Sequence, residues 1–469
     1  MTTVLWGCSL NQEPETSWTD GAFYETEGQI QALLEGAYVK LENALGVGFM
    51  VYGDIRSDLY RCYNTNKVEF LNIMDNVITP YNSYSSWANF YAAIQQANLV
   101  LSNAPEMYDQ GIIGQDCLNE IMGEAYCLRA FAYFWITRIW GAAPLVLKPA
   151  ISSDYNARMK RSSEGELLAS IHADLEAAYK LLPDDSEKTH FTLSAAWAIT
   201  AQVCAWEKDW NGVIEACDRI DPQKYELAEL YKSGYVIGTT AFMKYIEDSE
   251  YARIFNMGGQ SESIFELSFS LDDSSDSKLL YGMVGYSETI RPDLELLSEY
   301  KMIRNKDWRY FVNFYDDTRV TKYFINYSGL AEDTRNVVLL RMTEIVLLKA
   351  EAQIELAVNL GGDEGNKLIN DALSAINRIR TRAGGEDNMI EEVYTIDNVE
   401  DLKELLAEER KFELYGEGYR FLDLVRTGKV IDVMGPRNNQ NDIRSILWPV
   451  YYTEMIYSNG SIEQNEYYK

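Results

Sequence analysis

The chain has 469 residues, of which 47% are hydrophobic and 24% charged, and its 72 acidic against 42 basic residues give a formal net charge of −30. This length and composition are those of a folded protein with a large core and room for two or three domains. So acidic a surface repels phosphate backbones and anionic headgroups, which excludes non-specific binding to nucleic acid.

The amino terminus contains Leu5-Trp6-Gly7-Cys8, a sequence typical of the end of a bacterial lipobox. The polar residues from Ser9 to Asp20 then suit a flexible tether, so residues 1–20 are predicted to be a lipobox remnant and tether. The seven residues before Cys8 are too few for the basic and apolar regions of a signal peptide, so a trimmed start and a chance match stay equally open. No run of about 18 apolar residues occurs elsewhere, and we expect no membrane span.

Apolar residues recur at helical spacing over most of the chain. The segment 115–140 is apolar on nearly every side, which predicts a central helix that ends at Gly141 and Pro144. The segment 192–219 resembles a helix hairpin of tetratricopeptide size, and a similar hairpin is predicted further on. The predicted helical ranges are 27–45, 84–103, 115–140, 164–182, 192–219 (two helices), 341–358 and 366–383.

Residues 234–330 interrupt this helical pattern. The pair Gly258-Gly259, the alternation over 264–269 and the acidic run 272–277 indicate loops and short strands. Long irregular insertions on helical scaffolds often carry function. We therefore expect one compact, mainly all-α unit with a helical half over 21–233, a loop-rich insertion over 234–330 and a second helical half over 331–469.

Most catalytic motifs are missing from the sequence. The two histidines, His172 and His190, have no nucleophile motif beside them, and no phosphate-binding loop or zinc-protease motif occurs. The cysteines form no C-x-x-C pair and no zinc-like spacing, so we expect no metal and no cofactor. A glycoside hydrolase remains open, because it needs only two carboxylates roughly 5–10 Å apart.

Four ordered blocks resemble the SusD/RagB family and together span nearly the whole chain. The first, Gly123–Phe134 followed by Arg138-Ile139-Trp140-Gly141, is similar to the family's G-E-A-x-x-L-R-A-x-x-Y-F and Y-G stretch. The tail departs from the family pattern, since Glu466-Tyr467 replace a proline and a glycine and Tyr451 replaces a proline. The other three blocks are Arg341–Ala352 with Asn377–Gly384, Glu409–Arg426, and Trp448-Pro449-Val450 with Gln464–Tyr468.

The charged residues of these blocks have a structural interpretation. Arg341 with Glu344, and Glu409, Arg410, Glu413 and Arg420, lie at helical spacing and are expected to form ion networks that hold helices in register. They identify the fold and are not predicted to be the binding site.

The resemblance implies a SusD-like helical scaffold with tetratricopeptide-like hairpins and no catalytic activity. It implies a protein anchored by lipid at Cys8 on the outer face of the outer membrane. There it would pair with a SusC-like TonB-dependent transporter and capture a glycan, or in some members a peptide, for import. Helical-repeat surfaces would face the transporter and the irregular loops would face the ligand.

Sugar rings bind against flat aromatic side chains, and their hydroxyls bind carboxylates, amides and guanidinium groups. The loop over 54–64 and the stretch from Tyr281 to Arg291 offer this combination. For each candidate, ordinary packing is an equal alternative, and a hydrolase, a peptide-binding relative or a cytosolic tetratricopeptide-type scaffold are competing functions. The predicted glycan-binding residues are Asp58, Tyr60, Arg61, Tyr63, Tyr281, Tyr286 and, more weakly, Trp308.

Overall fold

The structure is a computed structural model and describes residues 25–150, 159–184, 187–269, 290–314, 320–323 and 336–469. Helices account for most of these residues, and the strands within them form two short pairs. The prediction of a mainly all-α fold is confirmed.

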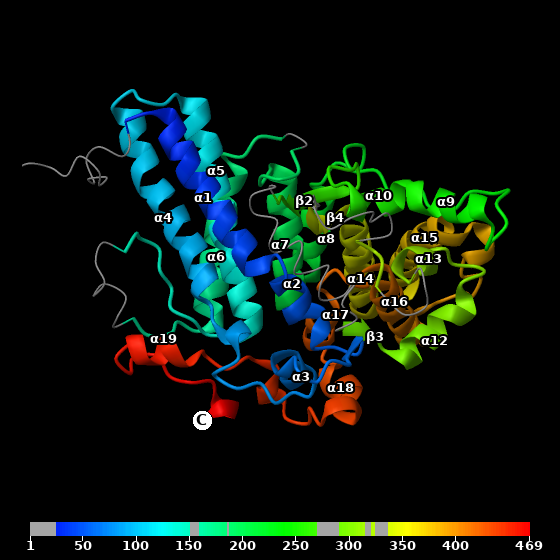
Figure 1. The fold of residues 1–469 in the computed structure, drawn as a ribbon. Helices are drawn as coiled ribbons and strands as arrows, with labels where there is room; N and C mark the ends of the chain where they lie inside the picture. The colour runs from blue at the N-terminus through cyan, green and yellow to red at the C-terminus, as the bar shows by residue number, and fades with distance from the viewer. Residues whose placement is uncertain (1–24, 151–158, 185–186, 270–289, 315–319, 324–335) are drawn as a thin grey trace, which may run out of the picture.

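Four long helices pack side by side in the N-terminal half (Figure 1). One of them is apolar nearly all round, and every residue from Cys127 to Gly141 is buried, which confirms the prediction of a central helix. The helices are α1 (Glu27–Leu45), α4 (Ala88–Asp109), α5 (Gln115–Trp140) and α6 (Glu164–Tyr179).

Helix α4 begins and ends later than the predicted range of 84–103. The Asn82 side chain accepts a hydrogen bond from the backbone N–H of Tyr84 and starts a separate 3-10 turn over Ser83–Ser85. The Ser86 hydroxyl then accepts a bond from the N–H of Ala88, where the α-helix begins. Local side-chain bonds of this kind compete with the helix and delay its start.

A second group of helices forms the other side of the molecule (Figure 1). It contains both predicted hairpins, and the first one turns at Lys208, whose φ of 61° ends its leading helix in the left-handed conformation. The helices are α7 (Leu193–Glu207), α8 (Trp210–Asp218), α14 (Met342–Leu360), α15 (Gly362–Gly384) and α16 (Val399–Glu413).

The expected loop-rich insertion also contains short helices that the sequence pattern did not reveal. Each runs for ten residues or fewer, so its periodicity does not stand out in a window of 11–18 residues. They are α9 (Thr240–Asp248), α10 (Glu250–Asn256), α12 (Leu294–Ile303) and α13 (Arg309–Asn313).

Two antiparallel strand pairs join distant parts of the chain. β1 (Tyr60–Cys62) pairs with β3 (Ile290–Pro292), and β2 (Ser263–Leu267) pairs with β4 (Val337–Arg341). The remaining short helical elements are α2 (Gly48–Met50), η1 (Val51–Ile55), α3 (Val68–Met74), α17 (Arg420–Arg426), α18 (Val430–Asn438), α19 (Tyr452–Tyr457) and 3-10 turns at Glu386–Asn388, Ile396–Asn398, Ile443–Ile446 and Glu466–Tyr468.

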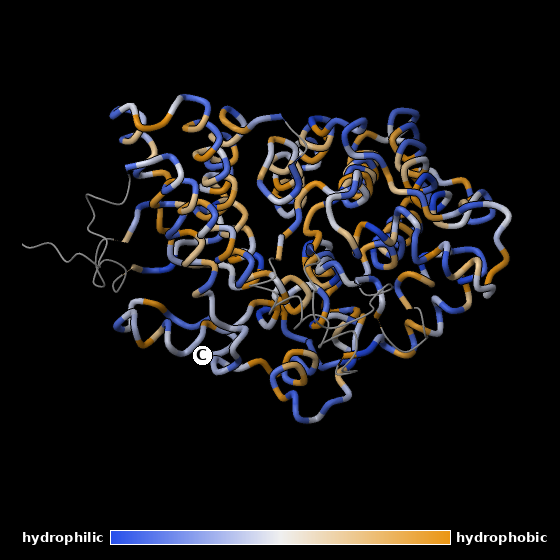
Figure 2. The backbone as a smooth tube through the Cα atoms, turned by 45° about the horizontal axis from the view of Figure 1, so that its top comes forward, coloured by the Kyte–Doolittle hydropathy of each residue, from blue (hydrophilic) through white to orange (hydrophobic). Residues whose placement is uncertain are grey.

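Most of the helices are amphipathic, with hydrophobic and hydrophilic residues along the same helix (Figure 2). Their apolar faces meet in one large core whose members range from Ile30 to Val450. The core therefore includes residues from both helical halves and from the insertion. Two smaller clusters pack around Ile376, between α14, α15 and α16, and around Met434 in α18.

A buried ion network holds the insertion against the C-terminal helices. Glu413 lies at its centre and is fully buried, and the side chains of the three arginines around it are at most 6% exposed. Its carboxylate lies 2.8 Å from Arg309, 2.8 Å from Arg341 and 2.5 Å from Arg382. These cations hold the pKa of the Glu413 carboxyl well below its usual range, although burial alone would raise it.

The pairing within this network differs from the one expected between Arg341 and Glu344. Arg341 is the N-cap of α14 and has extended backbone angles, so the helical spacing of three residues does not bring the two side chains together. Arg341 instead bonds Glu417 and Glu262, at 2.6 Å each. Glu344 lies 3.4 Å from Arg410.

Candidate functional site

The β1–β3 pair joins the predicted loop over 54–64 to residues 290–292, at the end of the stretch predicted from Tyr281 to Arg291. Arg61 lies opposite Arg291 in the antiparallel register, and Tyr60 lies opposite Pro292. The backbone N–H of Asp293 donates to the carbonyl of Leu59 at 2.9 Å and extends the pairing by one residue. Figure 1 shows this small sheet beside α12 and α17.

A single carboxylate organises the side chains at this edge. Asp293 is the N-cap of α12, and its Oδ1 accepts hydrogen bonds from the backbone N–H groups of Glu295 and Leu296. Its Oδ2 lies 3.1 Å from Nε of Arg61 and accepts a bond of 2.8 Å from Nη1 of Arg437. One residue therefore starts a helix and fixes two partly exposed guanidinium groups.

An aromatic ring adjoins these cations. Tyr63 is 49% exposed, and the guanidinium carbon of Arg291 lies 5.4 Å from the centroid of its ring, in cation–π range. A ring with an open face beside several N–H donors suits a ligand that presents both C–H groups and hydroxyls. We call this group the arginine–tyrosine edge, and it consists of Arg61, Tyr63, Arg291 and Arg437, with Asp293 as its anchor.

Asp58 and Tyr60 lie beneath this edge and are buried. The Asp58 carboxylate accepts bonds of 2.8 and 2.9 Å from Arg420. Burial raises the pKa of Asp58, but the bonds from Arg420 outweigh it and hold that pKa below its ordinary value. The Tyr60 ring packs 5.2 Å from the ring of Tyr415. Both residues support the backbone that carries Arg61 and Tyr63.

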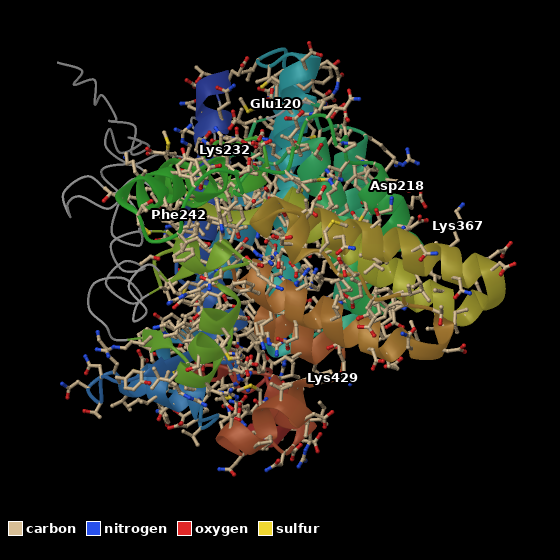
Figure 3. The ribbon with its side chains drawn as sticks, turned by 90° about the vertical axis from the view of Figure 1, so that its right-hand side faces the viewer. Glu120, Asp218, Lys232, Phe242, Lys367 and Lys429 are labelled. Atoms are coloured by element: carbon tan, nitrogen blue, oxygen red, sulfur yellow. The ribbon has the colours of Figure 1, made fainter. Side chains whose placement is uncertain are left out.

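Trp308 lies in a different environment. It is buried, and its ring packs 4.7 Å from Tyr231 and 5.0 Å from Phe242, which is labelled in Figure 3. The next residue, Arg309, donates to the Asp307 carboxylate at 2.9 and 2.5 Å. The turn over 307–309 is thus a structural one. Tyr281, Tyr286 and Cys8 lie outside the described residues.

Sequence reasoning did not select Asp293 and Arg437. Asp293 had a local signal, since an aspartate before Leu294-Glu295-Leu296 matches a helix N-cap. Arg437 had none, because it reaches the edge from α18, near the other end of the chain.

Two family models match the chain, one at each end. The first, described as starch-binding associating with outer membrane, matches residues 10–205. The second, described as the SusD family, matches residues 295–468. The chain belongs to the SusD/RagB family.

Similar proteins match either nearly the whole of this SusD/RagB chain or a part of it. A SusD-like protein called P38 from Formosa agariphila is 28% identical, with 98% of this chain and 96% of that protein aligned. A SusD-like protein from Bacteroides ovatus is 28% identical over 43% of this chain and 36% of its own length. The family consists of outer-membrane-associated binding proteins that typically bind carbohydrate.

Solved structures of SusD proteins share the fold of this chain. A SusD superfamily protein from Bacteroides vulgatus superposes with a TM-score of 0.76 at 20% identity, over 95% of this chain and 99% of that one. A protein described as a laminarin-binding SusD-like protein gives a TM-score of 0.70 at 18% identity, over 94% and 100% of the two chains. These likenesses confirm the SusD-like helical scaffold.

In the described part of this SusD/RagB chain, none of the helices combines the length and the hydrophobicity that crossing a membrane requires. The same part of the chain contains no group of three or more His, Cys, Asp or Glu side chains that could hold a metal ion.

Proposed function

We propose that this protein captures a glycan at the cell surface and passes it to a SusC-like TonB-dependent transporter, without cleaving it. The arginine–tyrosine edge would be the contact surface. The observation that carries the proposal is the half-exposed ring of Tyr63 beside the cation of Arg291 and the anchored guanidinium groups of Arg61 and Arg437. The name of the laminarin-binding relative supports a carbohydrate as the ligand class.

The carboxylates at the edge favour binding over hydrolysis. A glycosidase needs one carboxyl group that gives up a proton and a second one that acts as base or nucleophile. Asp293 bonds Arg61 and Arg437, and Asp58 bonds Arg420. The bonds from Arg420 hold the pKa of Asp58 below its ordinary value, which makes this carboxyl group a poor proton donor. The Asp293 oxygens are taken up by Arg61, by Arg437 and by the backbone N–H groups at the start of α12.

Attachment to the outer membrane through a lipid on Cys8 and pairing with a transporter are parts of the same proposal. Fractionation of cells that express the full-length precursor tests the first part. We expect the protein in the outer-membrane fraction, labelled by a fatty-acid analogue, and expect Cys8→Ser to remove the label. A protein that stays soluble and unlabelled would favour the cytosolic scaffold instead.

The binding function can be tested by native electrophoresis through gels that contain different polysaccharides. We expect one glycan class to retard the protein, without release of reducing ends from any polysaccharide in the panel. Tyr63→Ala should abolish the retardation and leave the melting temperature unchanged, because its ring is half exposed. Tyr81→Ala is the matched control, since Tyr81 is 72% exposed and lies outside the edge.

The opposite results would be equally informative. Full retardation of Tyr63→Ala would place the binding surface elsewhere. Accumulating reducing ends would establish a hydrolase. A protein that no polysaccharide retards, but that binds peptides, would replace glycan by peptide as the cargo.

A further inference from the structure

A cleft of about 490 Å³ lies on the side of the molecule that contains the two helix hairpins. Helices α8, α14, α16, α17 and α18 surround it, and its floor is made by the buried side chains of Ile354, Leu406 and Leu424. Figure 3 looks onto this side and labels Lys429, which lines the cleft. Its volume falls within the range of roughly 300–1,000 Å³ that is usual for small-ligand sites.

The charges that line the cleft balance, although the whole chain carries −30. Six of the lining residues are acidic and six are basic. The acidic ones are Glu351, Glu355, Glu400, Glu404, Glu408 and Asp423, and the basic ones are Lys208, Lys403, Arg410, Arg420, Arg426 and Lys429. The cleft is therefore a neutral area on a strongly acidic protein, and an anionic ligand meets less repulsion there.

Most of these carboxylates are already neutralised by a cation of the protein. Lys403 lies 3.0 Å from Glu355 and 3.1 Å from Glu400. In the same way Glu351 is bound by Arg426, Glu408 by Lys411, and Asp423 by Arg410 and Arg426. Within the described part of the chain, Glu404 is the acidic lining residue for which no ion pair is found.

The two exposed lysines of the cleft differ from its other cations. No salt bridge to Lys208 or Lys429 is found among the described residues, whereas the four remaining cations are all paired. Lys208 ends α7 with a φ of 61°, and Lys429 lies between α17 and α18. Both ammonium groups therefore start from fixed turns and are available to a ligand.

An indole ring completes the lining. Trp210 begins α8, and Asp209 fixes this turn by accepting a hydrogen bond of 3.1 Å from the backbone N–H of Gly212. The ring is half-buried, and no hydrogen bond or ring contact to it is found among the described residues. A fixed, partly open indole is a platform on which the C–H face of a sugar ring can lie.

We infer that this cleft is a second saccharide site, separate from the arginine–tyrosine edge, and that it selects acidic sugars. The sugar ring lies on Trp210, and its carboxylate binds between Lys208 and Lys429. We choose an acidic sugar on the ground of charge complementarity, because the charged lining residues without an ion pair are two cations and one anion. The inference rests on the proposed function only for the choice of saccharide as the ligand class.

Titration calorimetry with trigalacturonic acid, and with neutral galactotriose as the comparison, tests the inference on the intact protein. We expect the acid to bind more tightly than the neutral sugar, and rising NaCl to weaken its binding. The double variant Lys208→Ala/Lys429→Ala should lower the affinity for the acid at least tenfold, as should Trp210→Ala. Lys367→Ala is the charge-matched control, because Lys367 is exposed and lies well away from Lys429 in Figure 3.

Any of four results would overturn the inference. The wild-type protein could fail to bind trigalacturonic acid, or bind the neutral sugar equally well. The lysine variants could lose no more affinity than Lys367→Ala. Lastly, Tyr63→Ala could abolish binding of the acid while the lysine variants retain it, which would place the acid at the edge and leave the proposed function standing. Retention of the acid by Tyr63→Ala supports two separate sites.

Discussion

Asp58 and Arg420 are joined by two parallel hydrogen bonds, of 2.8 and 2.9 Å, although 362 residues separate them in the sequence. The pair fastens the segment before β1 to the start of α17. Because Arg61 and Tyr63 follow directly, the position of the arginine–tyrosine edge depends on this buried ion pair.

Asp58→Ala should therefore lower both stability and affinity. Removing one partner of a buried ion pair costs roughly 3–5 kcal/mol of unfolding free energy, because the other charge remains buried. Urea unfolding measures this loss, and affinity electrophoresis measures the binding. Arg61→Ala is the comparison, since Arg61 is partly exposed and should affect binding more than stability. Unchanged stability of Asp58→Ala would contradict the role of the pair.

Gly53 and Gly418 bring two backbone segments into direct contact. A Cβ atom at Gly53 would lie 1.8 Å from the carbonyl oxygen of Gly418. We expect Gly53→Ala to cost about 3 kcal/mol or more, or to prevent folding, since backbone cannot move aside as a side chain does. Gly28→Ala in α1 meets no atom within 4 Å and should be neutral or slightly stabilising. Thermal melts of the two variants give the comparison.

Glu413 balances three buried arginines, so Glu413→Gln should destabilise the protein strongly. Its loss removes a carboxylate that the three arginines share and leaves an excess of positive charge in the buried network, at an expected cost of roughly 3–5 kcal/mol. Glu408→Gln on the same helix is the control. Glu408 is 58% exposed and pairs with Lys411, so its loss should cost less than about 1 kcal/mol. Equal effects in urea unfolding would mean that the buried network contributes no more than a surface pair.

His190 should make stability depend on pH in the alkaline range. Its hydrogen bond to Glu124, helped by the charge of Glu35, raises the pKa of His190 to about 9 despite partial burial. The folded state thus holds this proton more tightly than the unfolded state, whose histidine pKa is about 6.5. The stabilisation is complete below about pH 6.5 and is lost as the pH rises through about 9.

The difference in unfolding free energy between wild type and His190→Gln, measured at pH 6 and pH 9.5, isolates this effect. We expect the difference to shrink at the higher pH. His172→Gln is the control, because His172 pairs with Glu207 and their side chains are 38% and 33% exposed. A difference that does not change with pH would rule out the proton on His190 as its source.

Helices were the part of the fold that the sequence predicted best. Amphipathic periodicity located α1 and α5 at their observed bounds, because each runs for at least five turns and buries one side or all sides. The start of α4 was missed because Asn82 and Ser86 form local hydrogen bonds that periodicity does not report. The short helices of the insertion were missed because one to three turns give too little pattern.

The candidate site was only partly predictable for a geometric reason. In a strand, alternate side chains point to opposite faces, which separates Arg61 and Tyr63 from Tyr60. A loop was expected over 54–64, so this alternation was not applied and Tyr60 was selected with its exposed neighbours. Asp293 and Arg437 reach the edge from distant segments, and a single sequence does not reveal which distant segments meet.

The pairing of β1 with β3 also bears on how the protein refolds. Two short strands have little stability by themselves, and these two meet only after a long loop has closed. Contacts between distant residues form slowly compared with helices. After dilution from urea, the helical signal should return first and glycan binding only later, so binding competence is a stricter measure of complete refolding than circular dichroism.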